Sequence, residues 1–265
     1  MPQSIVLQVG QCEIASRFWN LALQEEAKYN TSGVYNDSLA TFFRNVDPRK
    51  RKANISVGLP ITALKARGIM IDMEEGVINS ISSSPLNDLF DSHQKIVSNS
   101  GSGNNWGQGY HEYGDKYGED ILESIRKEAE WCDSLQSFIL LHSTGGGTGS
   151  GLGSYISALL KDNYSEIYRF AAGIVPSAND DVVTSPYNSI LTLSKLIQNM
   201  DCLLPLDNES LFTIYEKINS LKKKKSSSTL VDNGSATRKI YDRSRNDAFN
   251  TMNNIVANLL LNMTR

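Results

Sequence analysis

The chain of 265 residues contains few cysteines and no long apolar run. Its three cysteines, Cys12, Cys132 and Cys202, lie far apart and form no CxxC pair. This spacing argues against a disulfide framework and against a zinc site, and it favours a reducing compartment. No eighteen apolar residues occur together, and the first residues, MPQSIVLQVGQ, are too short and too polar for a secretory signal. We therefore expect a cytoplasmic protein without a membrane span.

The sequence also lacks an excess of charge of one sign. Its 26 Lys and Arg residues against 29 Asp and Glu give a net charge of −3. This balance predicts no general attraction to nucleic acid or to an anionic membrane, so neither is expected as a partner.

Two common phosphate-binding motifs are missing as well. No glycine is followed by lysine, which excludes the Walker pattern GxxxxGK[ST], and no stretch matches GxGxxG. A nicotinamide or flavin enzyme therefore lacks its main sequence support.

The chain does show apolar runs of strand length that alternate with helical spacing of apolar residues. The strand-like runs are Ser4–Val9, Arg67–Asp72, Lys95–Ser98, Phe138–His142, Arg169–Val175 and Cys202–Leu206. The helix-like segments are Ile14–Tyr29, Asp120–Cys132, Leu152–Asp162 and Tyr187–Gln198. This alternation predicts an α/β fold with a doubly wound, mostly parallel sheet and helices on both faces. Ligands of such sheets bind at the carboxyl ends of the strands.

A glycine-rich stretch stands at one of those ends. Residues 140–153 read LLHSTGGGTGSGLG, in which six of the last nine residues are glycine. A strand, a bare turn and a helix start together present free backbone N–H groups and a positive helix end, which bind phosphate. The Thr148 hydroxyl adds a further donor.

The stretch GGGTGSG, after an apolar strand and His-Ser, resembles the signature of the tubulin superfamily. Further motifs follow in the order of that family: Val9–Cys12, Asp72–Glu74, Gly101–Trp106, Ser185–Asn188, Asp207–Glu209, and Asn253–Asn254 with Phe249. On these motifs the chain is identified as a member of the superfamily, with the GTP-binding fold of tubulins.

The resemblance implies that GTP or GDP is bound together with Mg²⁺. It assigns nucleotide contacts to Gln11, Cys12, Asn104, Ser143, Gly146, Gly147, Thr148, Gly149, Asp181, Asn208, Phe249 and Asn253. Within this set Asn208 and Asn253 would pair with guanine and Phe249 would stack on it. Glu74 and Asp72 would serve the magnesium ion, for which carboxylate oxygens are suitable ligands. Taken without the resemblance, the Asp-x-Glu pair would be a helix cap and Phe249 a core residue.

Other segments resemble the epsilon branch of the superfamily, which is associated with centrioles and basal bodies. These are Phe42–Asp47, Ile71–Val77, Ile255–Asn262 and the insertion before the last helix. The resemblance implies a structural constituent of microtubule-based structures in the cytoskeleton, at the microtubule-organising centre. Its expected partners are other tubulins, through longitudinal contacts, and centriolar proteins.

The chain departs from the family pattern in two loops. The first loop reads Gly10-Gln11-Cys12-Glu13, shorter than in other tubulins and without their second glutamine. Glu13 would bring negative charge near the phosphates, so either affinity is reduced or this stretch is a gene-model error. Thr184-Ser185 stands where other tubulins often have a glutamate, which leaves Asp181 for the ribose contact.

We expect three regions: a GTP-binding domain over 1–221, a basic insertion over 222–246, and the start of the central helix over 247–265. Within the insertion, Lys222–Arg245 holds eight Lys or Arg against two Asp, so it carries +6 and the rest −9. Such a segment is expected to be solvated and disordered, and the alternative is a docking loop for an acidic partner.

The family's second and C-terminal domains are expected to be absent, since the chain ends at Arg265. GTP hydrolysis is then expected only where a neighbouring subunit completes the site. Apolar residues occupy more than one face of the central helix: Phe249, Met252, Val256 and Leu260 lie along one side, and Ala257 and Leu261 extend the apolar surface around it. Part of this helix should therefore be exposed and promote self-association.

Two other functions remain open on the sequence. One is a phosphate- or dinucleotide-binding α/β enzyme, which would need a catalytic His or Lys in the cleft, and the other is a nonfunctional tubulin fragment. The identity of the bound nucleotide separates the first alternative from a tubulin.

Overall fold

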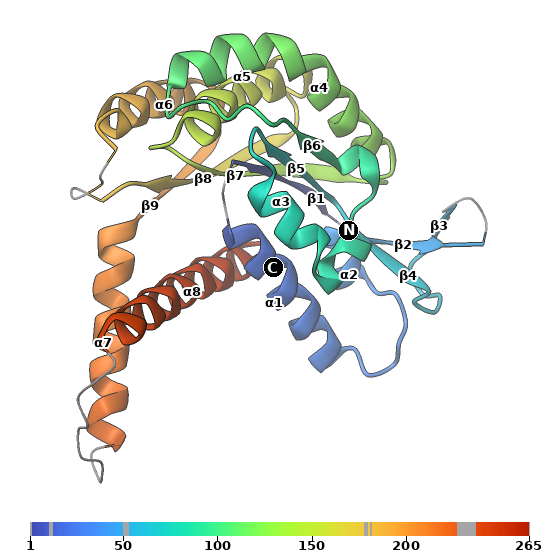
Figure 1. Ribbon diagram of the computed structural model, residues 1–265. Helices are drawn as coiled ribbons and strands as arrows, with labels where there is room; N and C mark the ends of the chain where they lie inside the picture. The colour runs from blue at the N-terminus through green and yellow to red at the C-terminus, as the bar shows by residue number, and fades with distance from the viewer. Residues whose placement is uncertain are drawn as a thin grey trace.

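A computed structural model shows a six-stranded parallel sheet with helices on both faces (Figure 1). The structure describes residues 2–10, 13–49, 53–177, 180, 182–226 and 237–264. The sheet order is β6-β5-β1-β7-β8-β9, and every neighbouring pair is parallel. The strands are β1 Gln3–Val9, β5 Gly68–Asp72, β6 Lys95–Val97, β7 Leu135–Ser143, β8 Tyr168–Val175 and β9 Cys202–Asp207. The predicted doubly wound α/β fold is confirmed.

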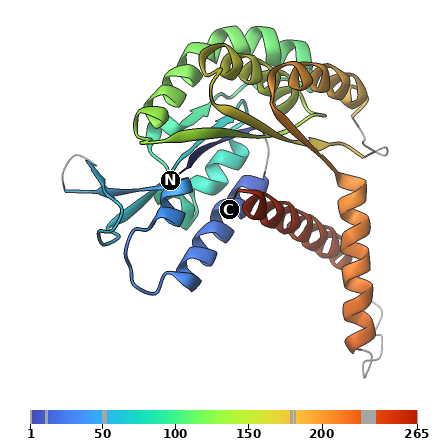
Figure 2. The same cartoon turned by 180° about the vertical axis from the view of Figure 1, so that it is seen from behind.

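The helices form a layer on each side of this sheet, as Figures 1 and 2 show. One layer holds α4 Gly114–Glu130, α5 Gly153–Asn163 and α6 Ser185–Asn199. The other holds α1 Glu13–Tyr29, α2 Asp37–Phe42, α3 Glu75–Ser82 and α8 Thr237–Met263. Because strand side chains alternate between faces, Ile5 and Leu7 enter one apolar core and Val6 enters the other. Short helical turns η1 Pro85–Leu89, η2 Ser92–Gln94, η3 Gln108–Tyr113 and η4 Thr148–Leu152 complete the layers.

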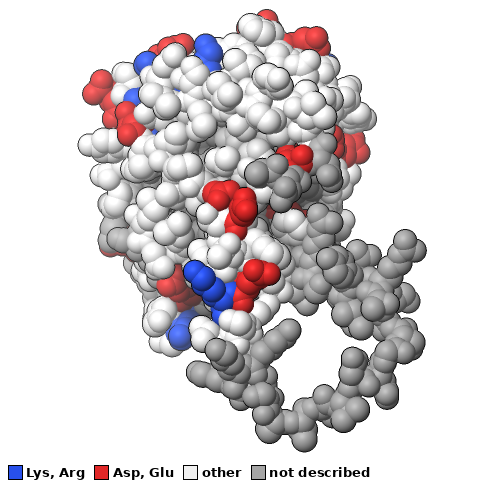
Figure 3. Space-filling view, turned by 90° about the vertical axis from the view of Figure 1, so that its left-hand side faces the viewer, with Lys and Arg blue, Asp and Glu red and all other residues white. Residues whose placement is uncertain are grey.

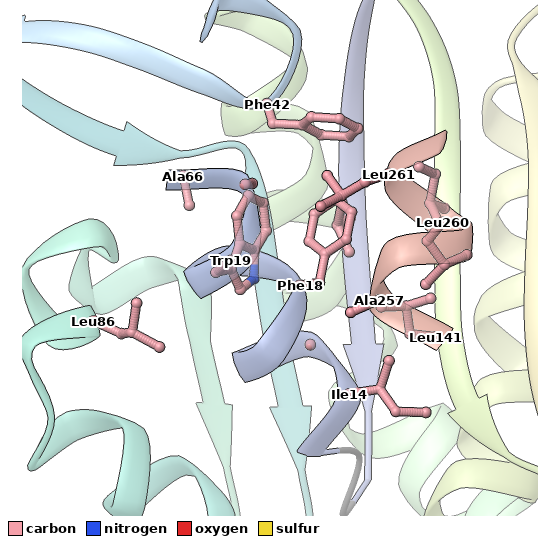
Figure 4. Packing of buried hydrophobic residues seen from close by; sticks show 14 of the residues in the cluster. Ile14, Phe18, Trp19, Phe42, Ala66, Leu86, Leu141, Ala257, Leu260 and Leu261 are labelled. Atoms are coloured by element: carbon pink, nitrogen blue, oxygen red, sulfur yellow. The ribbon is translucent and has the colours of Figure 1, made fainter. Parts of the chain in front are cut away.

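The last helix packs on the first. Figure 4 shows Ala257, Leu260 and Leu261 of α8 beside Ile14 and Phe18 of α1, and all five are buried. Other apolar side chains of α8 remain at the surface, with Phe249, Leu259 and Met263 exposed by 44%, 39% and 51%. The self-association expected from this helix stays a prediction.

A second sheet, which the sequence reading did not predict, projects from the domain (Figure 1). Its strands β2 Phe43–Asp47, β3 Ala53–Ile55 and β4 Ala63–Ala66 are antiparallel in the order β3-β2-β4.

Ion pairs join this small sheet to the main domain. The buried Arg44 guanidinium donates to Asp91 at 2.7 Å and lies 4.0 Å from Glu128, and Lys65 lies 3.2 Å from the Asp91 carboxylate. The Arg44 guanidinium also lies over the ring of Trp131, 3.8 Å from its centroid.

The residues between β9 and the last helix include helical backbone. Helix α7 runs from Asn208 to Ser226 and projects away from the sheet, and α8 begins at Thr237 (Figure 1). Residues 227–236 of the basic insertion lie outside the described residues, so the predicted domain limits and disorder stay predictions. Among the described residues no helix combines the length and apolar character needed to cross a membrane.

Helix α6 has an unusual distribution of side chains. Its buried residues are Ser185, Asn188, Ser189, Thr192 and Leu196, four of which are polar. Its exposed large hydrophobic side chains are Tyr187, Ile190, Leu191 and Ile197. Figure 3 views the side on which Figure 1 places α6, and uncharged residues predominate in its upper part. The polar face of α6 therefore points inward, and its apolar face points to solvent.

Candidate functional site

Two adjoining hollows lie at the carboxyl ends of the central strands. The first, which we call the inner chamber, is lined by Gly10, Asp72, Glu74, Ser102, Asn104, Ser143 and Gly146–Gly149. The second, the outer chamber, is lined by Ser143, Gly145, Gly146, Ile174, Pro176, Ser177, Asp180, Val182, Ser185, Asn208 and Phe249. Ser143 and Gly146 belong to both linings, so the two hollows meet at the glycine-rich turn.

The glycines of this turn serve two different purposes. A side-chain carbon on Gly147 would lie 2.6 Å from the Asn105 nitrogen, and one on Gly149 would lie 2.7 Å from the Ser143 oxygen. These two glycines let neighbouring loops approach one another. On Gly146 the same carbon would meet only the Asn104 Oδ1 atom within 4 Å, at 3.9 Å. Gly146 therefore faces open space between the chambers.

A buried histidine holds the glycine-rich turn through a hydrogen bond. His142 is fully buried at the end of β7, and its Nδ1 atom lies 2.9 Å from the Gly149 oxygen. Burial lowers the pKa of His142 to about 4, so the ring is neutral at pH 7. The contact with a carbonyl requires the proton on Nδ1, which makes His142 a donor to the turn.

The loop over Gly101–Trp106, which we call the third loop, lies across the glycine-rich turn. Gly101, Gly103 and Asn104 have φ values of 45°, 53° and 54°, a left-handed backbone that glycine and asparagine tolerate. The Gly101 N–H donates to the Met73 oxygen at 2.8 Å, and the Ser102 and Thr148 hydroxyls lie 2.8 Å apart. The bend brings Asn104 to the inner chamber.

Two carboxylates also line the inner chamber. Asp72 is buried at the end of β5, and its Oδ1 atom accepts the Glu74 N–H at 3.1 Å. Its Oδ2 atom is buried without a hydrogen-bond partner in the described part of the chain, and burial raises the pKa of Asp72 to about 6. Glu74 is exposed. A cation beside Asp72 would satisfy the buried oxygen, so these residues fit a magnesium ion.

The described residues contain no group of three or more His, Cys, Asp or Glu side chains that could hold a metal alone. Magnesium is commonly held by one or two carboxylates, water and the phosphates of a ligand. The carboxylate pair fits that mode of binding.

The structure brings together most of the predicted site residues. Asn104, Ser143, Gly146, Gly147, Thr148, Gly149, Asp72 and Glu74 line the inner chamber, and Asn208 and Phe249 line the outer one. Asn253 is half-buried on α8 and lines neither chamber. Gln11, Cys12 and Asp181 lie outside the described residues.

Nine residues that line the chambers were not selected from the sequence, and among them Gly10, Ser102 and Ser185 belong to quoted motifs. Gly10 begins the first loop, and its left-handed φ of 76° favours glycine. Ser102 lines the inner chamber, and Ser185, which donates to Asp180 at 2.5 Å, lines the outer one.

Comparison with known proteins places this site in a family. A family model described as the GTPase domain of the Tubulin/FtsZ family matches residues 3–216. The chain belongs to the tubulin family.

The chain is similar over its whole length to tubulin epsilon chains. It is 49% identical over 275 aligned residues to the tubulin epsilon chains of Mus musculus and Homo sapiens. These alignments cover 100% of this chain and 57% of each relative. The tubulin beta-1 chain of Mus musculus is 33% identical over 217 residues, which cover 81% of this chain and 47% of the relative. The chain thus spans little more than half the length of the epsilon tubulins it matches, and the predicted epsilon-like character is confirmed.

Proposed function

We propose that this tubulin-family chain binds GTP or GDP with Mg²⁺ across the inner and outer chambers. The observation that carries the proposal is the junction of the chambers at Ser143 and Gly146. One elongated ligand can span that junction, with its phosphates among the glycines and its base beside Asn208 and Phe249.

The inner chamber would hold the phosphates and the metal. Backbone N–H groups of the glycine-rich turn supply donors for phosphate oxygens, and the start of η4, which continues into α5, adds a positive helix end. Asp72 and Glu74 would hold Mg²⁺, which neutralises phosphate charge when bound.

The outer chamber would recognise the base. The Asn208 amide offers both a donor and an acceptor, as the edge of guanine requires, and the ring of Phe249 supplies an apolar surface. Contacts from Gln11, Cys12, Asp181 and Asn253 are proposed on the family resemblance alone.

The wider role is proposed from the relatives. We infer a cytoskeletal protein that contacts other tubulins longitudinally, with an epsilon-like role at centrioles and basal bodies and centriolar proteins as partners. GTP hydrolysis would require an acidic residue from a neighbouring subunit.

The test is the nucleotide that the purified chain retains and binds. After denaturation, chromatography should release GTP or GDP, and calorimetry should show Mg²⁺-dependent binding of GTP that excess ATP does not displace. Equal competition by ATP, or release of a nicotinamide or flavin, would overturn the proposal.

A further inference from the structure

The side chain of Asn188 joins two loops of the candidate site. Its Nδ2 group donates to the Asn104 oxygen at 2.9 Å and to the Gly145 oxygen at 2.8 Å. Its Oδ1 atom accepts the Trp106 N–H at 3.1 Å. The two carbonyls and the one N–H fix the orientation of the amide, since a flipped amide would lose all three bonds.

These contacts connect three separate segments. Asn104 and Trp106 belong to the third loop, Gly145 belongs to the glycine-rich turn, and Asn188 belongs to the first turns of α6. Asn188 is 4% exposed and lines neither chamber, so its amide is used within the protein rather than offered to a ligand. A hydrogen-bonded amide of this kind holds loops in place because each unmade bond would leave a buried polar group unsatisfied.

Asn188 holds the middle of the third loop through Asn104 and its end through Trp106. The beginning of the loop is tied to the domain by the Gly101 N–H and by the Tyr113 hydroxyl, which donates to the Gly101 oxygen at 2.6 Å. In the left-handed middle of the loop, the Asn104 oxygen accepts from Asn188 and from the Thr184 hydroxyl, the latter at 2.8 Å. Both donors come from the start of α6.

The position of the loop determines which part of a nucleotide it can contact. The third loop lines the inner chamber with Asp72 and Glu74, whereas Asn208 and Phe249 line the outer chamber. A nucleotide with its base in the outer chamber therefore brings the end of its phosphate chain to the third loop. A displaced loop should weaken binding of a triphosphate more than binding of a diphosphate.

We propose that Asn188 is a positioning residue that holds the third loop against the glycine-rich turn and so sets the preference for GTP over GDP. This inference rests on the proposed function. Helix α6 would then link the terminal phosphate, through the third loop, to the exposed surface of the domain.

The experiment compares Asn188→Ala with Thr192→Val as a matched control. Thr192 is equally buried on α6, and its hydroxyl donates only to the Asn188 backbone oxygen within the helix, at 2.7 Å. Dissociation constants for GTP and GDP, both with Mg²⁺, are measured by calorimetry on the full chain. Asn188→Ala should weaken GTP binding by about tenfold and GDP binding by less than about twofold, because two of the three lost hydrogen bonds hold the third loop, which lies at the phosphate end. Thr192→Val should leave the ratio of the two constants unchanged.

A second variant keeps the inference falsifiable if Asn188→Ala does not fold. Thr184→Val removes the other donor to the Asn104 oxygen at an exposed position, and it should weaken GTP binding selectively by about threefold. Equal losses for GTP and GDP in the folded variants would overturn the role of Asn188 while leaving nucleotide binding intact. A parent chain that binds neither nucleotide would instead refute the proposed function, and the inference with it.

Discussion

Replacing Gly146 by alanine separates ligand binding from folding at the glycine-rich turn. The added methyl group has no protein atom within 4 Å except the Asn104 Oδ1 atom at 3.9 Å, and Gly146 is not in the left-handed region. The backbone therefore accepts alanine without strain. Since Gly146 lines both chambers, the methyl group occupies space where a nucleotide would cross from one to the other.

Gly146→Ala should leave the nucleotide-free protein as stable or more stable, but it should weaken the binding of GTP. Alanine restricts the unfolded chain more than glycine, so the nucleotide-free variant should be as stable as the parent or more stable by about 0.4–1 kcal/mol. A methyl group against the phosphates should weaken GTP at least tenfold, which is about 1.4 kcal/mol. At a GTP concentration of about 100 times the parent dissociation constant, the stabilisation by ligand should fall from about 2.7 to about 1.4 kcal/mol.

Thermal unfolding with and without Mg-GTP measures both quantities in one assay. Gly147→Ala is the contrasting variant, because its methyl group would lie 2.6 Å from the Asn105 nitrogen and 2.9 Å from the Ser102 oxygen. That variant should lose about 1–3 kcal/mol of stability even without nucleotide. Gly76→Ala, at an exposed position with open space, controls for the substitution itself. Unchanged GTP affinity in a folded Gly146→Ala protein would refute the placement of the ligand.

Three further substitutions or modifications test other parts of the structure. Asp72→Asn should abolish the Mg²⁺ dependence of GTP affinity in calorimetry while stability without ligand stays equal or rises, because burial disfavours the charged carboxylate; a retained Mg²⁺ effect would exclude Asp72 as a ligand. Arg44→Met removes the cation between the buried carboxylates of Asp91 and Glu128 and should cost about 3 kcal/mol in urea unfolding, so a loss below 1 kcal/mol (about one neutral hydrogen bond) would contradict the assigned ion pairs. Burial raises the pKa of the Cys132 thiol to about 11, so only about 0.1% should be thiolate at pH 8; rapid alkylation of native Cys132 by iodoacetamide, followed by peptide mass mapping, would contradict this burial.

The parallel sheet could be predicted because its strands are short apolar runs separated by helical periodicity. Residues Phe138–His142 and Arg169–Val175 are strands in the structure, and both extend only a few residues beyond the predicted limits. Such strands are buried on both faces, so the apolar signal is continuous and strong.

Helix α4 shows where local rules mislead. Apolar periodicity predicted a start at Asp120, but the helix begins at Gly114. Gly114 and Gly118 weaken a helix when considered alone. In the structure, side-chain carbons on them would lie 2.5 Å and 2.7 Å from atoms of Tyr155 on α5, so the glycines permit close packing of the two helices. The compensating contact comes from a residue distant in sequence.

The small antiparallel sheet escaped prediction for a related reason. Its strands read FRNVD, ANI and ALKA, which are short, partly polar and joined by a basic loop. Arg44 in the first of them is 1% exposed because Asp91 and Trp131 receive it from elsewhere in the chain. Local sequence gives no sign that this charge is buried.

Most residues that line the candidate site could be predicted from the sequence, but their separate roles could not. The motifs identified the glycine-rich turn, the third loop and the carboxylate pair, all of which line one chamber. Sequence alone treated Gly146, Gly147 and Gly149 as equivalent, whereas the structure places loop atoms against two of them and open space beside the first. Asn188 ends the quoted motif Ser185–Asn188 but was not assigned a role, and in the structure its amide binds three backbone groups. That role depends on loops that meet only in the folded chain.

The polar inner face of α6 affects how this helix can respond to its surroundings. Apolar side chains can slide past one another with little loss of contact, but hydrogen bonds are directional and weaken steeply when their geometry changes. Asn188 and Ser189 bind the loops through such bonds, and Ser189 lies 3.1 Å from the Thr144 hydroxyl. Small displacements of α6 would therefore break contacts rather than stretch them. The helix should occupy discrete positions relative to the strand ends, and a change at the phosphates would reach its solvent-facing apolar side as an abrupt step instead of a gradual shift.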